Sequence, residues 1–279
     1  MNEELIAIIT EEIIRQLGVK TGEAHRASGE NTDKSIEALK PPAFDFADPD
    51  ALERMKKRTT ARIGVGRAGP RLTTQSLLQL RADHAQARDA VFADVDPKML
   101  ESLGLFSVQT RCDSKNTYIT RPDLGRLLSD EAVKTIESRC RMEPDVQIIA
   151  ADGLSSTAVE VNLPKLLPVL TEALGRKKIS VGTPVFVKYG RVACEDHISE
   201  IVRAKVVCIL IGERPGLATA ESMSAYIAYK AQIGMPESNR TVISNIHKNG
   251  TAAVEAGAYI ADIIEKILKN KASGVNLVN

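Results

Sequence analysis

Three short apolar runs rich in β-branched residues do most to limit the fold of this 279-residue chain: VQIIAADGLSS, TPVFVKYGRV and AKVVCILIGERPG. A fourth, weaker run is TVISNIH. Strands that are apolar on both faces and alternate with helices indicate a parallel sheet covered on both sides. The sequence therefore predicts an α/β fold, a Rossmann-like parallel sheet with flanking helices. Helices are expected at 164–175, 195–204, 220–230 and 252–270.

The first 20 residues predict a separate amphipathic helix. Leu5, Ile9, Ile13 and Leu17 recur every fourth residue, and acidic side chains fill much of the remaining surface. A polar stretch over 21–42 follows and is typical of a flexible linker. A short tethered helix is marginal alone, so its apolar stripe needs either a partner or the parent domain.

The remaining chain is predicted to consist of a mainly helical portion, 43–145, and an α/β portion, 146–279. A helix is expected from an N-cap at Asp48 or Asp50 through Met55. The GxGxxG spacing of residues 64–69 is weak evidence for a dinucleotide site, because no buried strand precedes it. A glycine turn leading into a helix from about Thr73 to Arg88 fits this stretch better.

Composition excludes several classes of protein. The chain has 37 Lys and Arg against 36 Asp and Glu, and aromatic residues make up 4% with no Trp, which argues against nucleic-acid binding. Apolar runs fall well short of the roughly 20 residues that span a bilayer. The N-terminus lacks the pattern of a secretory signal, so a cytoplasmic location is expected. Four cysteines without a CxxC pair suggest reduced thiols and no metal site.

Parallel sheets bind ligands beyond the carboxyl ends of their strands, which selects three loops, 152–155, 189–192 and 212–216. Asp152, Arg191 and Glu213 are the candidate binding side chains there. No catalytic residue is nominated, because GxSxG, HExxH and P-loop patterns do not occur in the sequence. Of the four histidines, His247 alone follows a predicted strand.

Several stretches in order resemble one family, the small subunits of ethanolamine ammonia-lyase. They cover about residues 50–276 and include ARIGVGRAGPRLTTQSLLQLRADHA, SKNTYITRPDLGRLL, DVQIIAADGLSS, VGTPVFVKYGRV, IGERPGL, ISNIHKNGT and KASGVNL. The resemblance implies an adenosylcobalamin-dependent lyase that converts ethanolamine to acetaldehyde and ammonia. It also implies a cofactor held between this chain and a large TIM-barrel subunit, which carries the radical chemistry, so that this subunit alone is inactive.

Carried over position by position, the family's cobalamin contacts fall on Val192 in YGRV, Glu213 in GERPG and Val242 in RTVISNIH, with Arg191 as a neighbouring candidate. A corrin rim presents amide side chains, which can donate to Glu213 and accept from Arg191. Core packing is the alternative role for the two valines.

The family is often packaged in bacterial microcompartments, and residues 1–20 resemble an encapsulation peptide that would dock on shell proteins. Two other functions stay open at this point. One is a free-standing nucleotide-binding α/β enzyme that uses the Gly64–Gly69 turn. The other is an adaptor subunit without a ligand.

Overall fold

The computed structural model describes residues 46–59 and 61–277. The predicted helix 1–20 and linker 21–42 lie outside the described residues. The chain divides into two compact units, 1–76 and 77–279.

The first unit contains a short helix and a hairpin. Asp48 caps helix α3 (Pro49–Lys56) by accepting a 2.8 Å hydrogen bond from Ala51 N, which confirms the predicted cap. Gly64 has φ +69° and lies against the side chain of Leu52, so a Cβ there would come within 2.9 Å of it. Strands β1 (Arg67–Ala68) and β2 (Arg71–Leu72) then form a hairpin. Gly64 lies in a bend, and among the described residues it is α3, not a strand, that precedes it.

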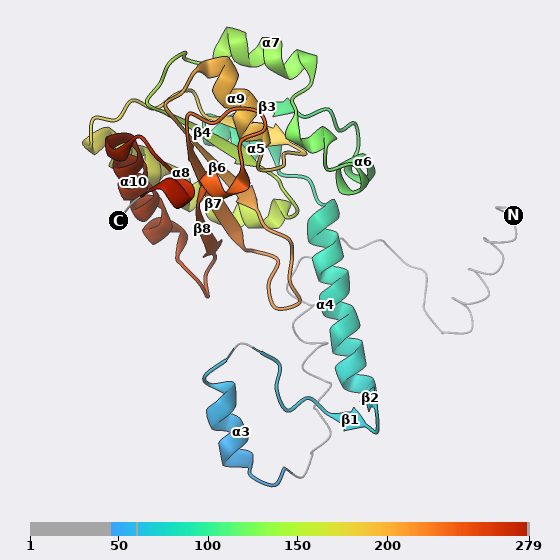
Figure 1. The fold of residues 1–279 in the computed structure, drawn as a ribbon. Coiled ribbons are helices and arrows are strands. Elements are labelled where there is room, and N and C mark those ends of the chain that lie inside the picture. The colour runs from blue at the N-terminus through green and yellow to red at the C-terminus, as the bar shows by residue number, and fades with distance from the viewer. Residues whose placement is uncertain (1–45, 60, 278–279) are drawn as a thin grey trace, which may run out of the picture. The chain divides into compact units, whose positions relative to one another are not determined.

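Helix α4 (Thr74–Phe92) follows the glycine turn, close to the helix predicted from about Thr73 to Arg88. The later elements, labelled in Figure 1, are α5 (Pro97–Ser102), β3 (Phe106–Gln109), α6 (Lys115–Thr120), η1 (Leu124–Arg126), α7 (Asp130–Arg139), β4 (Val146–Ala151), α8 (Ser156–Arg176), β5 (Val185–Lys188), α9 (Cys194–Val202), β6 (Val206–Gly212), β7 (Met223–Tyr229), η2 (Glu237–Asn239), β8 (Thr241–Ile246), α10 (Ala253–Asn270) and η3 (Gly274–Asn276).

The main sheet has the strand order β3-β5-β4-β6-β7-β8. The first four strands of this order are parallel, whereas β7 and β8 continue from β6 as antiparallel neighbours. The predicted α/β class is confirmed, but the sheet is mixed. Parallel neighbours need a long crossover, and the links from β6 to β7 and from β7 to β8 contain no α-helix to provide one.

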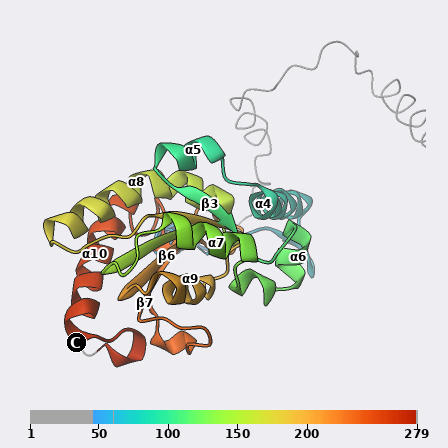
Figure 2. The same ribbon diagram turned by 90° about the horizontal axis from the view of Figure 1, so that it is seen from above.

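Helices cover the sheet on both faces, and Figure 2 shows the layers. Ile148 and Ala150 of β4 pack with α8 and α10, while Ile149 and Ala151 pack with α7 and α9. All six β4 residues and all seven β6 residues are buried. Each fully buried aliphatic side chain contributes about 1.5–3 kcal/mol, so these two strands and their cover form the core.

The predicted helix at 220–230 is wrong, because this stretch forms β7. Its sequence MSAYIAY contains helix-favouring Met and Ala residues. Pairing with β6 over seven residues outweighs that preference. Burial then alternates between the layers, with Ala225 and Ile227 in one and Ala228 in the other.

Two other elements differ from expectation. Helix α8 begins at Ser156, where Ser155 caps it, and not at 164. Pro164 and Pro168 therefore lie inside the helix and do not mark its start. Strand β3 comes from the portion predicted to be mainly helical and pairs with the edge of β5. Helices α9 and α10 and strand β8 lie close to their predicted ranges.

Two predictions made from composition can be compared with the described residues. Within 46–59 and 61–277, the helices are too short or too polar to cross a bilayer. All four cysteines are free and buried, as expected of reduced thiols.

The ends of β4 and β6 touch through their backbones at Gly212. A Cβ at this position would overlap the carbonyl oxygen of Ser155 and lie 2.6 Å from that of Asp152. Leu154 N donates a 3.1 Å hydrogen bond to Gly212 O, so the contact is also bonded. Only glycine fits here without moving backbone.

We therefore expect Gly212→Ala to lower the free energy of unfolding by about 1–3 kcal/mol, the usual cost of overpacking. The matched change Gly175→Ala, in α8, meets no heavy atom within 4 Å. It should be neutral or stabilise by up to about 1 kcal/mol, because alanine favours a helix. Denaturant unfolding of the full chain measures both, and equal effects would contradict the close contact at Gly212.

Candidate ligand-binding site

A pocket of about 370 Å³ lies at the carboxyl ends of the parallel strands. Helix α8 leaves β4 on one face of the sheet, and α9 leaves the neighbouring β5 on the other. Such a switch point opens a crevice between strand ends. Its lining residues are Tyr118, Gly153, Leu154, Arg191, Val192, Ile211, Gly212, Glu213, Arg214, Ser224, Tyr226 and Ser244.

Four residues were expected to contact cobalamin from the family resemblance. The structure brings three of them, Arg191, Val192 and Glu213, into one pocket. Arg191 and Val192 stand in the turn between β5 and α9, and Val192 also packs on the core. Arg191 Nη2 donates a 2.9 Å hydrogen bond to Tyr118 O. Arg191 Nε is buried and has no hydrogen-bond partner among the described residues. Arg191 lines the pocket and is only partly buried, so the outer N–H groups of its guanidinium, and not the buried Nε, are the donors that a ligand can reach.

Glu213, just beyond β6, is held as a carboxylate. Its oxygens accept hydrogen bonds from the hydroxyls of Ser224 and Ser222, the latter at 2.7 Å, and from Asn245 N at 3.3 Å. Burial alone would raise the pKa of Glu213, but these donors lower it on balance below its usual value. A carboxylate has about four acceptor positions, so about one remains for a ligand.

Val242 is exposed to 46% on β8 and does not line the pocket itself. It pairs with Tyr226 across the strands, and Ser244, two residues along the same face, does line the pocket. Core packing, the alternative role considered for Val242, does not match this exposure. The residue lies beside the pocket, where an apolar contact with a large ligand is available.

Asp152 lies beneath the site and not on its surface, because it is 1% exposed. Its Oδ1 accepts a 3.2 Å hydrogen bond from Gly190 N, and Lys115 Nζ lies 3.5 Å from Oδ2. Burial raises the pKa of Asp152, and the Lys115 ammonium opposes that rise. The role of Asp152 is to hold the β5–α9 turn that carries Arg191.

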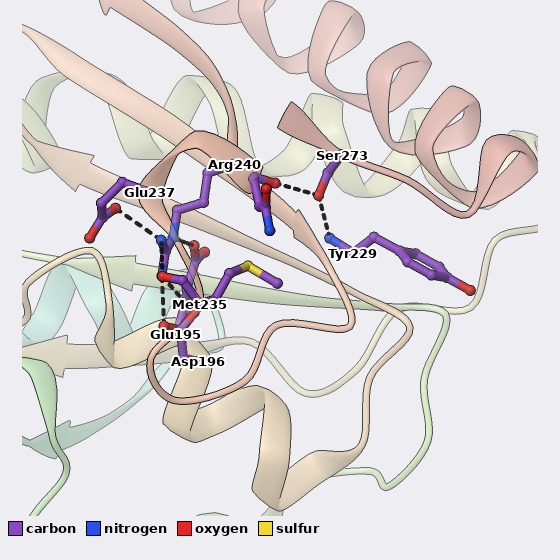
Figure 3. A network of polar contacts seen from close by, with 8 residues as sticks. Glu195, Asp196, Tyr229, Met235, Glu237, Arg240 and Ser273 are labelled. Carbon is purple, nitrogen blue, oxygen red and sulfur yellow. Dashed lines mark hydrogen bonds and ion pairs between the residues drawn. The ribbon is translucent and has the colours of Figure 1, made fainter. Parts of the chain in front are cut away.

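A buried ion cluster joins the first turn of α9 to the start of β8 (Figure 3). Arg240 Nε donates to Glu195 at 2.8 Å, and Nη2 donates to both oxygens of Asp196 at 2.7 and 2.6 Å. Arg240 Nη1 also reaches Glu237 at 2.9 Å. The cluster therefore links the element after Arg191 and Val192 to the strand that carries Val242.

Two fully buried carboxylates share one guanidinium in this cluster, which leaves an excess negative charge. Burial raises the pKa values of Glu195 and Asp196 against the pull of Arg240, that of Asp196 to about 6. Glu195 Oε2 has no hydrogen-bond partner within the described residues. The cluster depends on Arg240, because among the described residues it is the one cation paired with Glu195 and Asp196.

The C-terminal stretch KASGVNL packs on the same region. Ser273 Oγ accepts a 2.9 Å hydrogen bond from Tyr229 N and donates one of 2.6 Å to Asn239 O (Figure 3). Gly274 N donates to Thr241 Oγ1 at 2.9 Å. These bonds fix the residues on either side of Arg240.

His247, the histidine that the sequence favoured, has both ring nitrogens engaged locally. It bonds Asn245 Oδ1 at 2.8 Å and accepts from Asn249 N at 3.2 Å, so it stabilises the turn after β8. Within the described ranges, no group of His, Cys, Asp and Glu side chains is arranged to hold a metal ion.

Sequence reasoning missed several residues of the pocket, among them Tyr118, Ser224, Tyr226 and Ser244. Ser224 lies on the strand mistaken for a helix. Tyr118 lies in SKNTYITRPDLGRLL, one of the stretches that carried the family resemblance, but no spacing in the sequence connects it with Arg191.

The fold and the pocket together define an α/β protein with a candidate ligand-binding crevice at the carboxyl edge of its sheet. A family model described as ethanolamine ammonia-lyase light chain matches residues 49–278. The chain belongs to this family, the small subunits of ethanolamine ammonia-lyase, and a small subunit implies a large-subunit partner.

Three relatives named ethanolamine ammonia-lyase small subunit illustrate the similarity. The protein of Fusobacterium nucleatum subsp. nucleatum is 52% identical over 260 residues, covering 92% of this chain and 88% of the relative. That of Clostridium tetani is 60% identical over 80% of this chain and 76% of the relative. That of Clostridium acetobutylicum is 54% identical over 84% and 96%, respectively.

Arg240→Met should lower the free energy of unfolding by about 3–5 kcal/mol near pH 8, because it leaves buried carboxylates without their cation. The loss should be smaller near pH 5.5, where protonating them costs less. The raised pKa of Asp196 means that the folded chain keeps a proton that the unfolded chain loses. Its contribution to stability is therefore present at low pH and is lost as pH rises through about 6.

Denaturant unfolding at the two pH values measures this effect. Arg176→Met is the matched control, because Arg176 pairs with Glu172 on the surface and its side chain is 78% exposed. A loss at Arg240 that matched the control, or that was larger at pH 5.5, would show that Arg240 does not stabilise the cluster through its charge.

Proposed function

We propose that this chain is the small subunit of an adenosylcobalamin-dependent ethanolamine ammonia-lyase, which converts ethanolamine to acetaldehyde and ammonia. In this proposal the pocket at the carboxyl edge holds one side of the cofactor at the interface with the large catalytic subunit. The observation that carries the proposal is that Arg191 and Val192, in the turn after β5, line one pocket with Glu213, which follows β6.

The residues present fit the chemistry of a corrin rim, which carries amide side chains and methyl groups. The Arg191 guanidinium, which lines the pocket, can donate to an amide carbonyl through its outer N–H groups. Glu213 retains an acceptor position for an amide N–H. Val192 and the exposed Val242 offer apolar contact beside these groups.

The size of the pocket supports a shared site. A pocket of about 370 Å³ is near the lower end for a drug-sized ligand, so it can hold only one edge of a corrin. A second surface has to cover the rest. This agrees with a cofactor enclosed between two subunits.

The chemical role of this chain is then to bind, orient and exclude water. When bound, adenosylcobalamin supplies the radical that removes hydrogen from the substrate. Glu213, held ionised, fixes the edge of the ligand, while Arg191 fixes a second point. Two fixed points on a rigid ring limit its rotation within the pocket, so the chain contributes orientation.

We further propose that residues 1–20, which lie outside the described residues, direct the complex into a bacterial microcompartment within the cytoplasm. The support is the apolar stripe Leu5, Ile9, Ile13 and Leu17, which suits a helix docked in a groove of a shell protein.

Glu213→Gln, in the complex with the large subunit, should raise the apparent KM for adenosylcobalamin about ten-fold, since a hydrogen bond to a charged group contributes about 1.5 kcal/mol or more. Ethanolamine-dependent acetaldehyde release at varied cofactor measures it, with each chain alone as a blank. Activity should require both chains.

The matched control is Glu137→Gln, an exposed residue of α7. If both variants gave the same KM for the cofactor, Glu213 would not contact it. If both chains together had no activity with a proven large subunit, the lyase proposal would fail.

Deleting residues 1–20 should leave acetaldehyde release by the complex unchanged but abolish its co-sedimentation with microcompartment shells. Ile9→Ser with Ile13→Ser should act like the deletion, because the apolar stripe is broken. Glu4→Ser with Glu11→Ser, on the polar side of the predicted helix, should not. Unchanged co-sedimentation after the deletion would refute targeting by this segment.

A further inference from the structure

Tyr118 of α6 is the side chain on which the turn between β5 and α9 rests. It is fully buried. Its hydroxyl donates a 3.1 Å hydrogen bond to Gly190 O, and its ring lies 4.3 Å from Arg191 Cζ. Its own carbonyl accepts from Arg191 Nη2 at 2.9 Å. One residue therefore contacts two consecutive residues of the turn in three ways.

The same turn is held from its other sides. Gly190 N donates to Asp152 Oδ1 at 3.2 Å, and Thr110 Oγ1 donates to Tyr189 O at 2.9 Å. Tyr189 itself has φ +58°, a left-handed conformation that a non-glycine residue adopts only when its surroundings enforce it. The backbone of Tyr189 and Gly190 is therefore set by contacts, and Tyr118 supplies the one on the Gly190 carbonyl.

These contacts leave the Arg191 guanidinium with one orientation. The Tyr118 ring covers one face of it, and Nη2 is bonded to the Tyr118 carbonyl. Arg191 lines the pocket together with Glu213, so the outer N–H groups of the oriented guanidinium face the same space as the Glu213 carboxylate. An arginine side chain loses substantial rotamer freedom when a ligand fixes it. Here that loss occurs on folding, so the donor is preorganised for a ligand.

We propose that Tyr118 is a positioning residue for the cofactor: it sets the Gly190 carbonyl and the Arg191 guanidinium so that Arg191 presents a fixed donor to the polar edge of the corrin. This inference depends on the proposed function, because it assumes that the pocket holds adenosylcobalamin. It extends the site to α6, a helix that no comparison connects with ligand binding.

The test uses the complex of both subunits with Tyr118→Phe, which removes the hydroxyl and keeps the ring. The Gly190 carbonyl then loses a buried partner, and we expect the apparent KM for adenosylcobalamin to rise about five-fold to ten-fold. Turnover at saturating cofactor should change by less than about two-fold, because the hydroxyl does not act in the chemical step. Tyr259→Phe is the matched control, since Tyr259 is 54% exposed on α10.

A double-mutant cycle shows whether Tyr118 acts through Arg191. Tyr118→Leu and Arg191→Gln should each raise the cofactor KM, and the double variant should raise it by clearly less than the product of the two, because each removes the same oriented donor. Thermal unfolding of each variant monitors the fold. Fully multiplicative effects, or a fall in turnover with an unchanged cofactor KM, would overturn the proposal.

Glu213→Gln separates failure of this inference from failure of the proposed function. If Glu213→Gln raises the cofactor KM while Tyr118→Phe behaves like Tyr259→Phe, the pocket binds cofactor and Tyr118 does not position it. If neither Glu213→Gln nor Arg191→Gln changes that KM, the pocket is not the cofactor site.

Discussion

Complete burial of β4 and β6 is the constraint on which the rest of the structure depends. Strands apolar on both faces need helices on both sides, and here α8 and α10 cover one face while α7 and α9 cover the other. The connections that put helices on opposite faces also bring the loops after β4, β5 and β6 to one edge. The pocket is therefore a consequence of how the core is covered.

Polar groups beneath that edge convert a crevice into a fixed site. Asp152 accepts a hydrogen bond from the Gly190 amide, and Tyr118 donates one to the Gly190 carbonyl. Arg240 connects α9 to the start of β8 through its ion pairs. Each of these side chains is almost fully buried. Buried polar groups tolerate little displacement, because every lost hydrogen bond leaves a desolvated partner. These contacts hold the wall of the pocket in the arrangement that the structure shows.

The sequence alone predicted the elements whose burial shows in their composition. The runs that became β4, β5 and β6 contain Val and Ile on both faces, and the loops after them contain Arg191, Val192 and Glu213. Strand β7 was missed because MSAYIAY is a strand only through its pairing with β6, which no local pattern encodes. Tyr118 was missed for a similar reason, since its partner Gly190 is 72 residues away along the chain.

The balance of charges at the pocket explains why this chain orients a ligand more readily than it transforms one. Glu213 is ionised and already accepts three hydrogen bonds, so its pKa is shifted away from the neutral range that a general base needs. The guanidinium of Arg191 carries only hydrogen-bond donors and no acceptor. A fixed acceptor beside a fixed donor recognises amide groups along a ligand's edge. If the pocket holds the proposed cofactor, the reaction chemistry comes from that cofactor and from the large subunit.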